Sequence, residues 1–117
     1  MADSIVYEKS KIYAIRIIGV YKNLCNINRE YVMSKQLLRS STSIGANLAE
    51  AVYASSKKDF LNKIYISLKE ASESSYWLEL LYLTGYLKEN DYRSLEADCR
   101  EIIVMLNATT KTIRSRF

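Results

Sequence analysis

The sequence contains no proline, no histidine and only three glycines. A β-sandwich or β-barrel needs many tight turns, and such turns normally use glycine and proline. The scarcity of both residues therefore predicts an all-α fold. Histidine is the commonest metal ligand and the usual general base, so its absence disfavours most classes of enzyme. We expect no catalytic residues, no metal site and no cofactor.

Long hydrophobic runs are missing as well. No stretch approaches the roughly 20 apolar residues that a membrane-spanning helix requires. The first residues, MADSIVYEKSK, lack the basic region followed by an apolar core that is typical of an export signal. The two cysteines, Cys25 and Cys99, have no CxxC spacing, and we expect them to be reduced thiols. These features predict a cytoplasmic protein without a membrane partner.

The charge of the chain is mildly basic and uneven. Seventeen lysines and arginines against 13 aspartates and glutamates give a net charge of +4. Residues 1–58 hold nine basic and four acidic side chains, whereas residues 59–117 hold eight and nine. A basic half permits a polyanionic partner, although most such charges only solvate a surface.

Four segments have the apolar spacing of amphipathic helices. They cover residues 5–25, 31–53, 57–87 and 91–115, and together they fill one domain over residues 1–117. Short loops between long helices favour antiparallel neighbours. The pattern therefore predicts an antiparallel up-and-down four-helix bundle.

Capping residues and core positions follow from the same pattern. In the first segment, the apolar residues that we expect to face the core are Ile5, Ile12, Ile15, Ile18 and Tyr21. The expected N-caps of the four helices are Asp3 or Ser4, Asn28, Ser56 and Asn90. Ser56 and Asp59 resemble a capping box. Gly45 lies in a stretch of small residues, which is explained either by close helix packing or by a local bend.

The second half of the third segment is apolar on every side. Between Tyr76 and Leu87, nine of 12 residues are apolar or aromatic. Trp77, Leu80 and Leu87 are predicted to point away from the face of that helix that packs in the bundle. Either a neighbouring helix or the C-terminal tail covers them, or they form the interface of a homo-oligomer, which is the alternative we favour.

Basic side chains align on the first two segments. Lys9 and Arg16 are seven residues apart, and Lys35 and Arg39 are four apart, so each pair follows one line of its helix. Such stripes suit a phosphate backbone, and they predict a nucleic-acid-binding surface. Solvated helix faces are the commoner explanation for charges of this kind.

A long motif in the second segment resembles the bacterial family of four-helix bundles encoded in rRNA intervening sequences. The motif is Ser-Lys-Gln-Leu-Leu-Arg-Ser-Ser-Thr-Ser-Ile-Gly-Ala-Asn-Leu-Ala-Glu-Ala over residues 34–51. Shorter matches are Ser-Lys-Lys-Asp-Phe at 56–60, Lys-Glu-Ala at 69–71, Tyr-Trp-Leu at 76–78 and Gly-Tyr-Leu at 85–87. The similarity covers about three-quarters of the chain.

The resemblance implies an up-and-down four-helix bundle that assembles into a ring-like homopentamer. Its relatives include the accessory variability protein that partners a reverse transcriptase in diversity-generating elements. Nucleic-acid binding is proposed for basic members, and no catalysis is established for the family. Many members have two arginines after the Gln-Leu pair, whereas here Leu38 replaces one and leaves Arg39. Gly45 and Ala51 stand where many members have proline and glycine, which indicates a separate subgroup.

Two functions follow from these observations. The first is an oligomeric, non-enzymatic bundle that binds RNA, DNA or a nucleic-acid-handling protein through Lys9, Arg16, Lys35 and Arg39. The alternative is a protein-interaction scaffold without affinity for nucleic acid. Fluorescence anisotropy with labelled oligonucleotides distinguishes the two.

Overall fold

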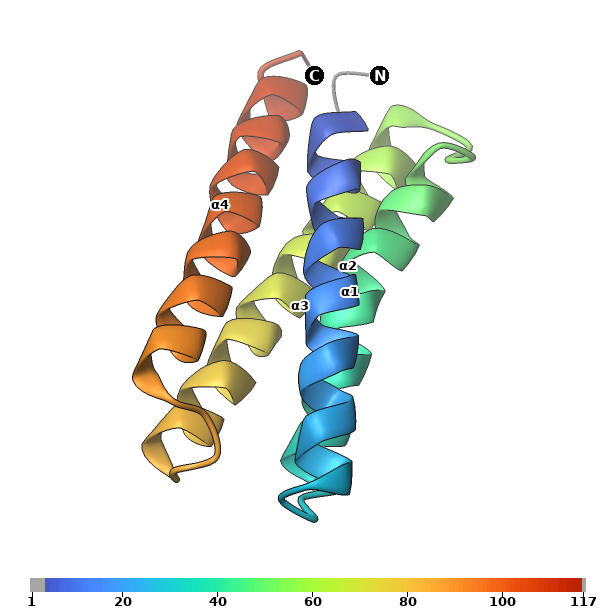
Figure 1. Cartoon of the computed structure of the whole chain (residues 1–117). Coiled ribbons are helices and arrows are strands. Elements are labelled where there is room, and N and C mark those ends of the chain that lie inside the picture. The colour runs from blue at the N-terminus through green and yellow to red at the C-terminus, as the bar shows by residue number, and fades with distance from the viewer. Residues whose placement is uncertain (1–3, 117) are drawn as a thin grey trace.

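The computed structural model describes residues 4–116 and contains four helices. These are α1 (Ser4–Asn26), α2 (Met33–Ala51), α3 (Lys57–Leu83) and α4 (Glu89–Arg114). Each helix packs against the next, and α4 packs against α1, so that the helices form a ring in the order of the chain (Figure 1). The described residues contain no strand. The predicted all-α, antiparallel up-and-down bundle is therefore confirmed, with dimensions of 48 × 21 × 18 Å.

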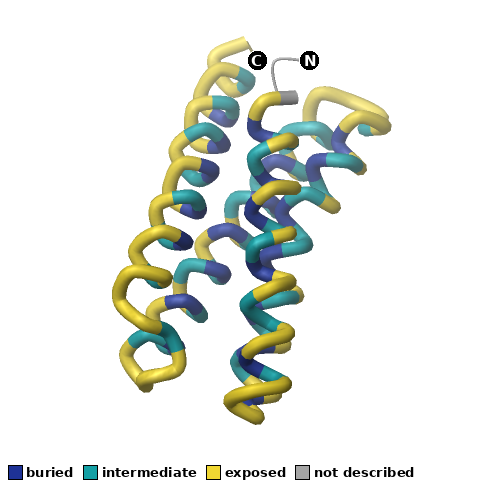
Figure 2. Tube along the Cα trace, in the orientation of Figure 1, coloured by how far each residue is buried: buried dark blue, intermediate teal, exposed yellow. Residues whose placement is uncertain are grey.

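One stripe of each helix faces a common core, which runs the length of the bundle (Figure 2). The buried side chains recur at steps of three, four or seven residues, as expected for helices that are each covered on one side. The largest of them are Val6, Tyr13, Ile17, Leu24, Leu37, Ile44, Ile64, Leu78, Leu81, Leu95, Ile102 and Leu106.

The predicted core face of α1 is wrong. Ile5, Ile12, Ile15 and Ile18 are 59%, 58%, 68% and 37% exposed, and Tyr21 is half-buried. The core face consists instead of four other residues at helical spacing, which are Val6, Tyr13, Ile17 and Leu24. Because α1 carries apolar side chains on two faces, the helical period alone does not decide which face is buried.

The start of α2 is capped by a glutamate from the preceding loop. The Glu30 carboxylate accepts hydrogen bonds from the backbone N–H groups of Val32, Met33 and Ser34 at 3.2, 3.1 and 2.7 Å. Burial opposes ionisation of this carboxyl, but the three N–H donors outweigh it and lower the pKa of Glu30. The prediction that Asn28 caps this helix is therefore wrong.

The other helix ends agree in part with the predictions. Ser56 Oγ accepts from Asp59 N at 3.0 Å, as predicted, although the Asp59 carboxylate accepts in return from Ser55 N rather than Ser56 N. Helix α4 begins at Glu89 after Lys88, which makes no side-chain cap bond, so Asn90 is not the cap. The proposed caps at Asp3 and the Ser4 side chain lie outside the described residues.

Helix α3 ends four residues earlier than predicted, at a glycine with a left-handed backbone. Gly85 has φ = +86°, a conformation that glycine adopts without steric cost. The N–H of Tyr86 donates to the carbonyl of Leu81 at 2.8 Å, and that of Gly85 donates to Tyr82 at 3.1 Å. This pair of bonds is a Schellman motif, which ends the helix.

Helices α1 and α2 approach closely at Gly45. A Cβ atom at this position would lie 2.9 Å from Ser10 Oγ of α1, which is closer than van der Waals contact allows. This contact explains the glycine by close packing. No described helix combines the length and hydrophobicity that crossing a bilayer requires.

Candidate interaction surfaces

The two basic residues predicted on α1 form ion pairs with α4. Lys9 Nζ lies 3.1 Å from Glu101 Oε1. Arg16 Nη1 donates to Asp98 Oδ2 at 2.6 Å, and its Nη2 donates to Ser94 Oγ at 3.0 Å. Both side chains are therefore directed to the contact between α1 and α4.

The basic residues predicted on α2 differ from each other. The Arg39 guanidinium pairs with Glu70 of α3 at 3.3 Å and also with Glu73. Lys35 is exposed and forms no ion pair within residues 4–116. Arg39 thus ties α2 to α3, whereas Lys35 is available to a ligand.

The structure does not bring the four predicted cations together. Lys9 and Arg16 lie where α1 meets α4, and Arg39 lies where α2 meets α3, which is the opposite side of the bundle. The paired carboxylates also reduce the positive potential at three of the four. The proposed nucleic-acid contacts at these residues stay a prediction, and they do not form one surface in a single subunit.

The residues predicted at a subunit interface are partly covered within the chain. Trp77, Leu80 and Leu87 are half-buried, and Trp77 and Leu87 pack against the core. The exposed large side chains of this segment are Tyr76, Leu83 and Tyr86. The predicted interface at Trp77, Leu80 and Leu87 stays a prediction, and it offers less apolar area than an uncovered segment would.

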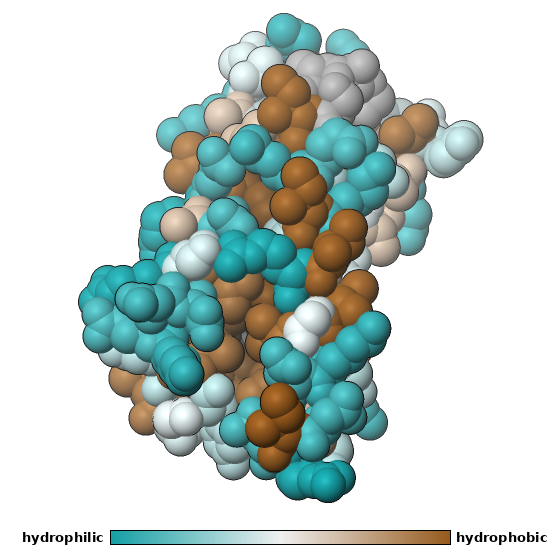
Figure 3. Space-filling view, in the orientation of Figure 1, coloured by the Kyte–Doolittle hydropathy of each residue, from teal (hydrophilic) through white to brown (hydrophobic). Residues whose placement is uncertain are grey.

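The outer face of α1 exposes more large apolar residues than any other helix. Figure 3 shows apolar side chains at intervals along this face, separated by polar ones. Ile5 and Ile12 are seven residues apart and Ile15 follows three later, which is the spacing of an apolar seam between helices. We call Ile5, Ile12, Ile15 and Ile18 the α1 isoleucines. The sequence contains this signal, but its helical spacing does not show which apolar face of α1 is buried.

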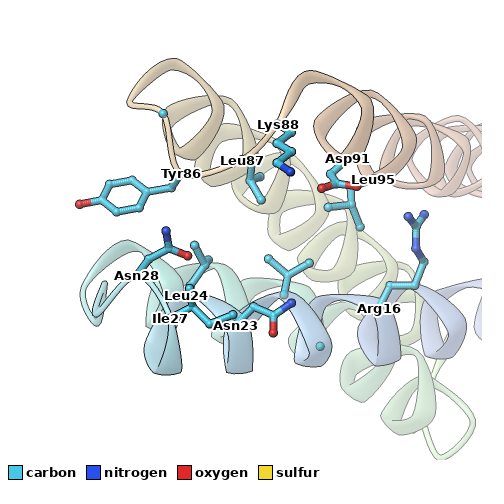
Figure 4. Close-up of a pocket in the computed structure, with 13 residues that line it drawn as sticks. Arg16, Asn23, Leu24, Ile27, Asn28, Tyr86, Leu87, Lys88, Asp91 and Leu95 are labelled. Carbon is cyan, nitrogen blue, oxygen red and sulfur yellow. The ribbon is translucent and has the colours of Figure 1, made fainter.

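A cleft of about 680 Å³ opens between the second half of α1 and the start of α4. Leu24 of α1 and Ile27, which directly follows this helix, lie on one side, and Leu87 and Leu95 lie on the other (Figure 4). Asn23, Asn28, Lys88 and Asp91 add polar groups around it. The cleft can accept an apolar group, and its lining contains no nucleophile paired with a base.

The cysteines offer little reactivity. Cys99 is buried, and burial raises the pKa of its thiol to about 11, so the thiol is protonated near neutral pH. Cys25 is half-buried, and both cysteines are free. Within the described residues, no group of three or more histidine, cysteine, aspartate or glutamate side chains has the arrangement of a metal site.

Comparison with known proteins agrees with the motif. The sequence model of the family described as 23S rRNA-intervening sequence protein matches residues 2–108. The chain is also similar to a crystal structure, at 1.70 Å, of a protein of unknown function from the S23 ribosomal protein family of Bacteroides thetaiotaomicron VPI-5482. The two are 50% identical, the TM-score is 0.92, and the match covers 95% of this chain and 99% of the other. No curated protein matches.

Proposed function

Because the chain belongs to the 23S rRNA-intervening sequence protein family, we propose that it is a non-enzymatic binding module that works as a homo-oligomer. The observation that supports assembly is the exposure of the α1 isoleucines, at 59%, 58%, 68% and 37%. Exposed apolar side chains at the spacing of a seam between helices favour association, because covering them releases about 25 cal/mol for each Å² of apolar surface removed from water. The absence of histidine supports a function other than catalysis.

Light scattering tests the assembly. We expect the wild-type particle to be several times heavier than one 13.5 kDa chain, and the resemblance of the motif implies five subunits. Changing Ile12 and Ile15 together to Glu should yield monomers that keep their helical circular dichroism, since an interface does not readily desolvate unpaired charges. The matched control is Lys22→Glu, at an exposed polar position of the same helix. A wild-type monomer at micromolar concentration would refute the proposal.

Nucleic-acid binding is the second candidate function, and a different observation favours it. Of the 17 lysines and arginines, seven are in ion pairs within the described residues, which leaves ten without a carboxylate partner there. Unpaired cations are the groups that displace counterions from a phosphate backbone. An oligomer repeats them in every subunit, and multivalency raises avidity by about 10²–10⁴ without new contacts.

Fluorescence anisotropy with labelled RNA and DNA of the same sequence tests this second function. We expect binding that tolerates changes of sequence and weakens with salt, with log K falling by about 0.7–0.9 per log unit of salt for each neutralised phosphate. The absence of binding by the assembled protein at about 50 mM salt would favour the alternative, a protein-interaction scaffold.

A further inference from the structure

Five exposed basic side chains gather at the end of the bundle where α3 begins and α4 ends. Lys57 and Lys58 are the first two residues of α3, and the other three are Lys111, Arg114 and Arg116. The start of α1 and the loop between α2 and α3 lie at this same end (Figure 1). We call these five residues the terminal basic cluster. They account for half of the ten cations that have no carboxylate partner within residues 4–116.

Two members of the cluster, one from the end of each helix, lie on one surface. Lys57 of α3 and Arg116, just beyond α4, line the same hollow, and Phe60 and Ile113 complete its lining. The hollow has a volume of about 140 Å³, which is below the range of about 300–1,000 Å³ for small-molecule sites. A ligand that uses the cluster therefore extends across the surface from one helix end to the other.

The stability of the two helices does not explain the positions of all five cations. Lys111 and Arg114 lie in the last turn of α4, where cations are favourable for the helix. Lys57 and Lys58 lie in the first turn of α3, where the positive end of the helix dipole makes cations unfavourable. The one acidic residue in that turn is Asp59, and its carboxylate accepts hydrogen bonds from Ser55 N and Oγ at 3.0 and 3.4 Å. Asp59 is therefore engaged within the chain and does not pair with the lysines.

We propose that the terminal basic cluster binds a phosphodiester backbone, with Lys57, Lys58 and Arg116 as its main contacts. This inference rests on the proposed nucleic-acid function and gives it a site different from Lys9, Arg16, Lys35 and Arg39. Phosphate contacts reward positive charge without a fixed hydrogen-bond pattern, and arginine adds bidentate contacts to phosphate oxygens. The cations are spread over two helix ends, so a ligand with many negative charges along an extended chain can contact several of them at once. Phe60 and Ile113 supply an apolar floor on which an unpaired base can pack.

The test compares two variants of the full-length protein that remove the same charge. The first changes Lys57, Lys58 and Arg116 to Gln. The control changes Lys22, Arg29 and Lys88 to Gln, which removes three exposed cations near the opposite end of the bundle, none of them in an ion pair within the described residues and none among the four predicted contacts. Fluorescein-labelled 20-nucleotide RNA and DNA are the probes, and light scattering verifies that both variants keep the wild-type assembly.

We expect the first variant to bind roughly tenfold or more weakly at about 50 mM salt, and its salt slope to fall by about 2 because three phosphate contacts are lost. The control should stay within about threefold of the wild type. Equal binding by all three proteins, or a larger loss in the control, would overturn this site while leaving the nucleic-acid function standing. If the wild type binds neither probe but binds polyglutamate, an acidic protein is the partner, and both proposals are overturned.

Discussion

At the scale of single residues, three hydroxyl groups form a hydrogen-bonded chain in the middle of the core. Tyr13 Oη lies 2.6 Å from Ser74 Oγ, which in turn lies 2.7 Å from Ser41 Oγ, and all three residues are fully buried. They come from α1, α3 and α2. Burial raises the pKa of Tyr13 well above its ordinary value, so its phenol stays protonated. Helices α1 and α3 lie diagonally across the core, and among the described residues no Cα atom of one lies within 8 Å of a Cα atom of the other. The hydrogen bond between Tyr13 and Ser74 therefore links two helices whose backbones are not in contact.

This chain of hydroxyls makes the effects of substitution unequal. Tyr13→Phe leaves Ser74 and Ser41 paired with each other, so we expect a loss of about 1 kcal/mol in the free energy of unfolding. Ser74→Ala removes the central member and leaves two buried hydroxyls without this partner, so the loss should be larger, at about 1–3 kcal/mol. The double variant should lose less than the sum of both. Urea unfolding measures all three, and additivity within about 0.5 kcal/mol would contradict the coupling.

At the scale of elements, the sequence predicted the four helices but not which face of α1 is buried. Val6 and Ile17 face the core while Ile12 and Ile15 face outward, so the helix is apolar on two sides. The buried face includes Tyr13, which an amphipathic pattern treats as an ambiguous residue and which the core buries completely. The Tyr13 hydroxyl forms a hydrogen bond with Ser74 of α3, which lies 61 positions further along the chain, and no local sequence pattern reveals such a partner.

The same limit applies to the candidate sites. The alignment of Lys9 with Arg16 follows from helical geometry and is readable from the sequence. Their carboxylate partners on α4, Glu101 and Asp98, are 92 and 82 residues away in the chain, and only the packing of the helices brings them together. For the same reason, the joint surface of Lys57 and Arg116 could not be inferred from their positions in the sequence.

The start of α2 shows how a capping rule fails when the turn before a helix brings a different residue to the cap position. Asn28 has the side chain of a good N-cap, but the chain turns there with Arg29 in a left-handed conformation, at φ = 55°. This turn carries Glu30 into position to accept three backbone N–H groups of the next helix. A carboxylate at a helix N-terminus also interacts favourably with the dipole, which adds to the hydrogen bonds.

At the scale of the whole molecule, two features with different chemistry occupy different parts of the surface. Ile12, Ile15 and Ile18 lie along the side of the bundle, whereas the terminal basic cluster lies at one end, where Ile5 also lies. We expect burial of Ile12 and Ile15 between subunits to leave the basic cluster of every subunit accessible. This arrangement allows assembly to increase the number of cationic sites rather than cover them.

The location of the subunit interface can be decided by a substitution in α3. The Trp77 side chain packs against the core, and its Nε1 donates to Glu73 Oε2 at 3.0 Å. Trp77→Asp removes this packing and places a second carboxylate beside Glu73, so we expect the free energy of unfolding to fall by about 2–4 kcal/mol. The loss should appear in urea unfolding of the monomeric Ile12→Glu/Ile15→Glu background, because it arises within one subunit. If Trp77→Asp leaves the stability of that monomer unchanged but dissociates the wild-type oligomer, the interface lies on α3 rather than on α1.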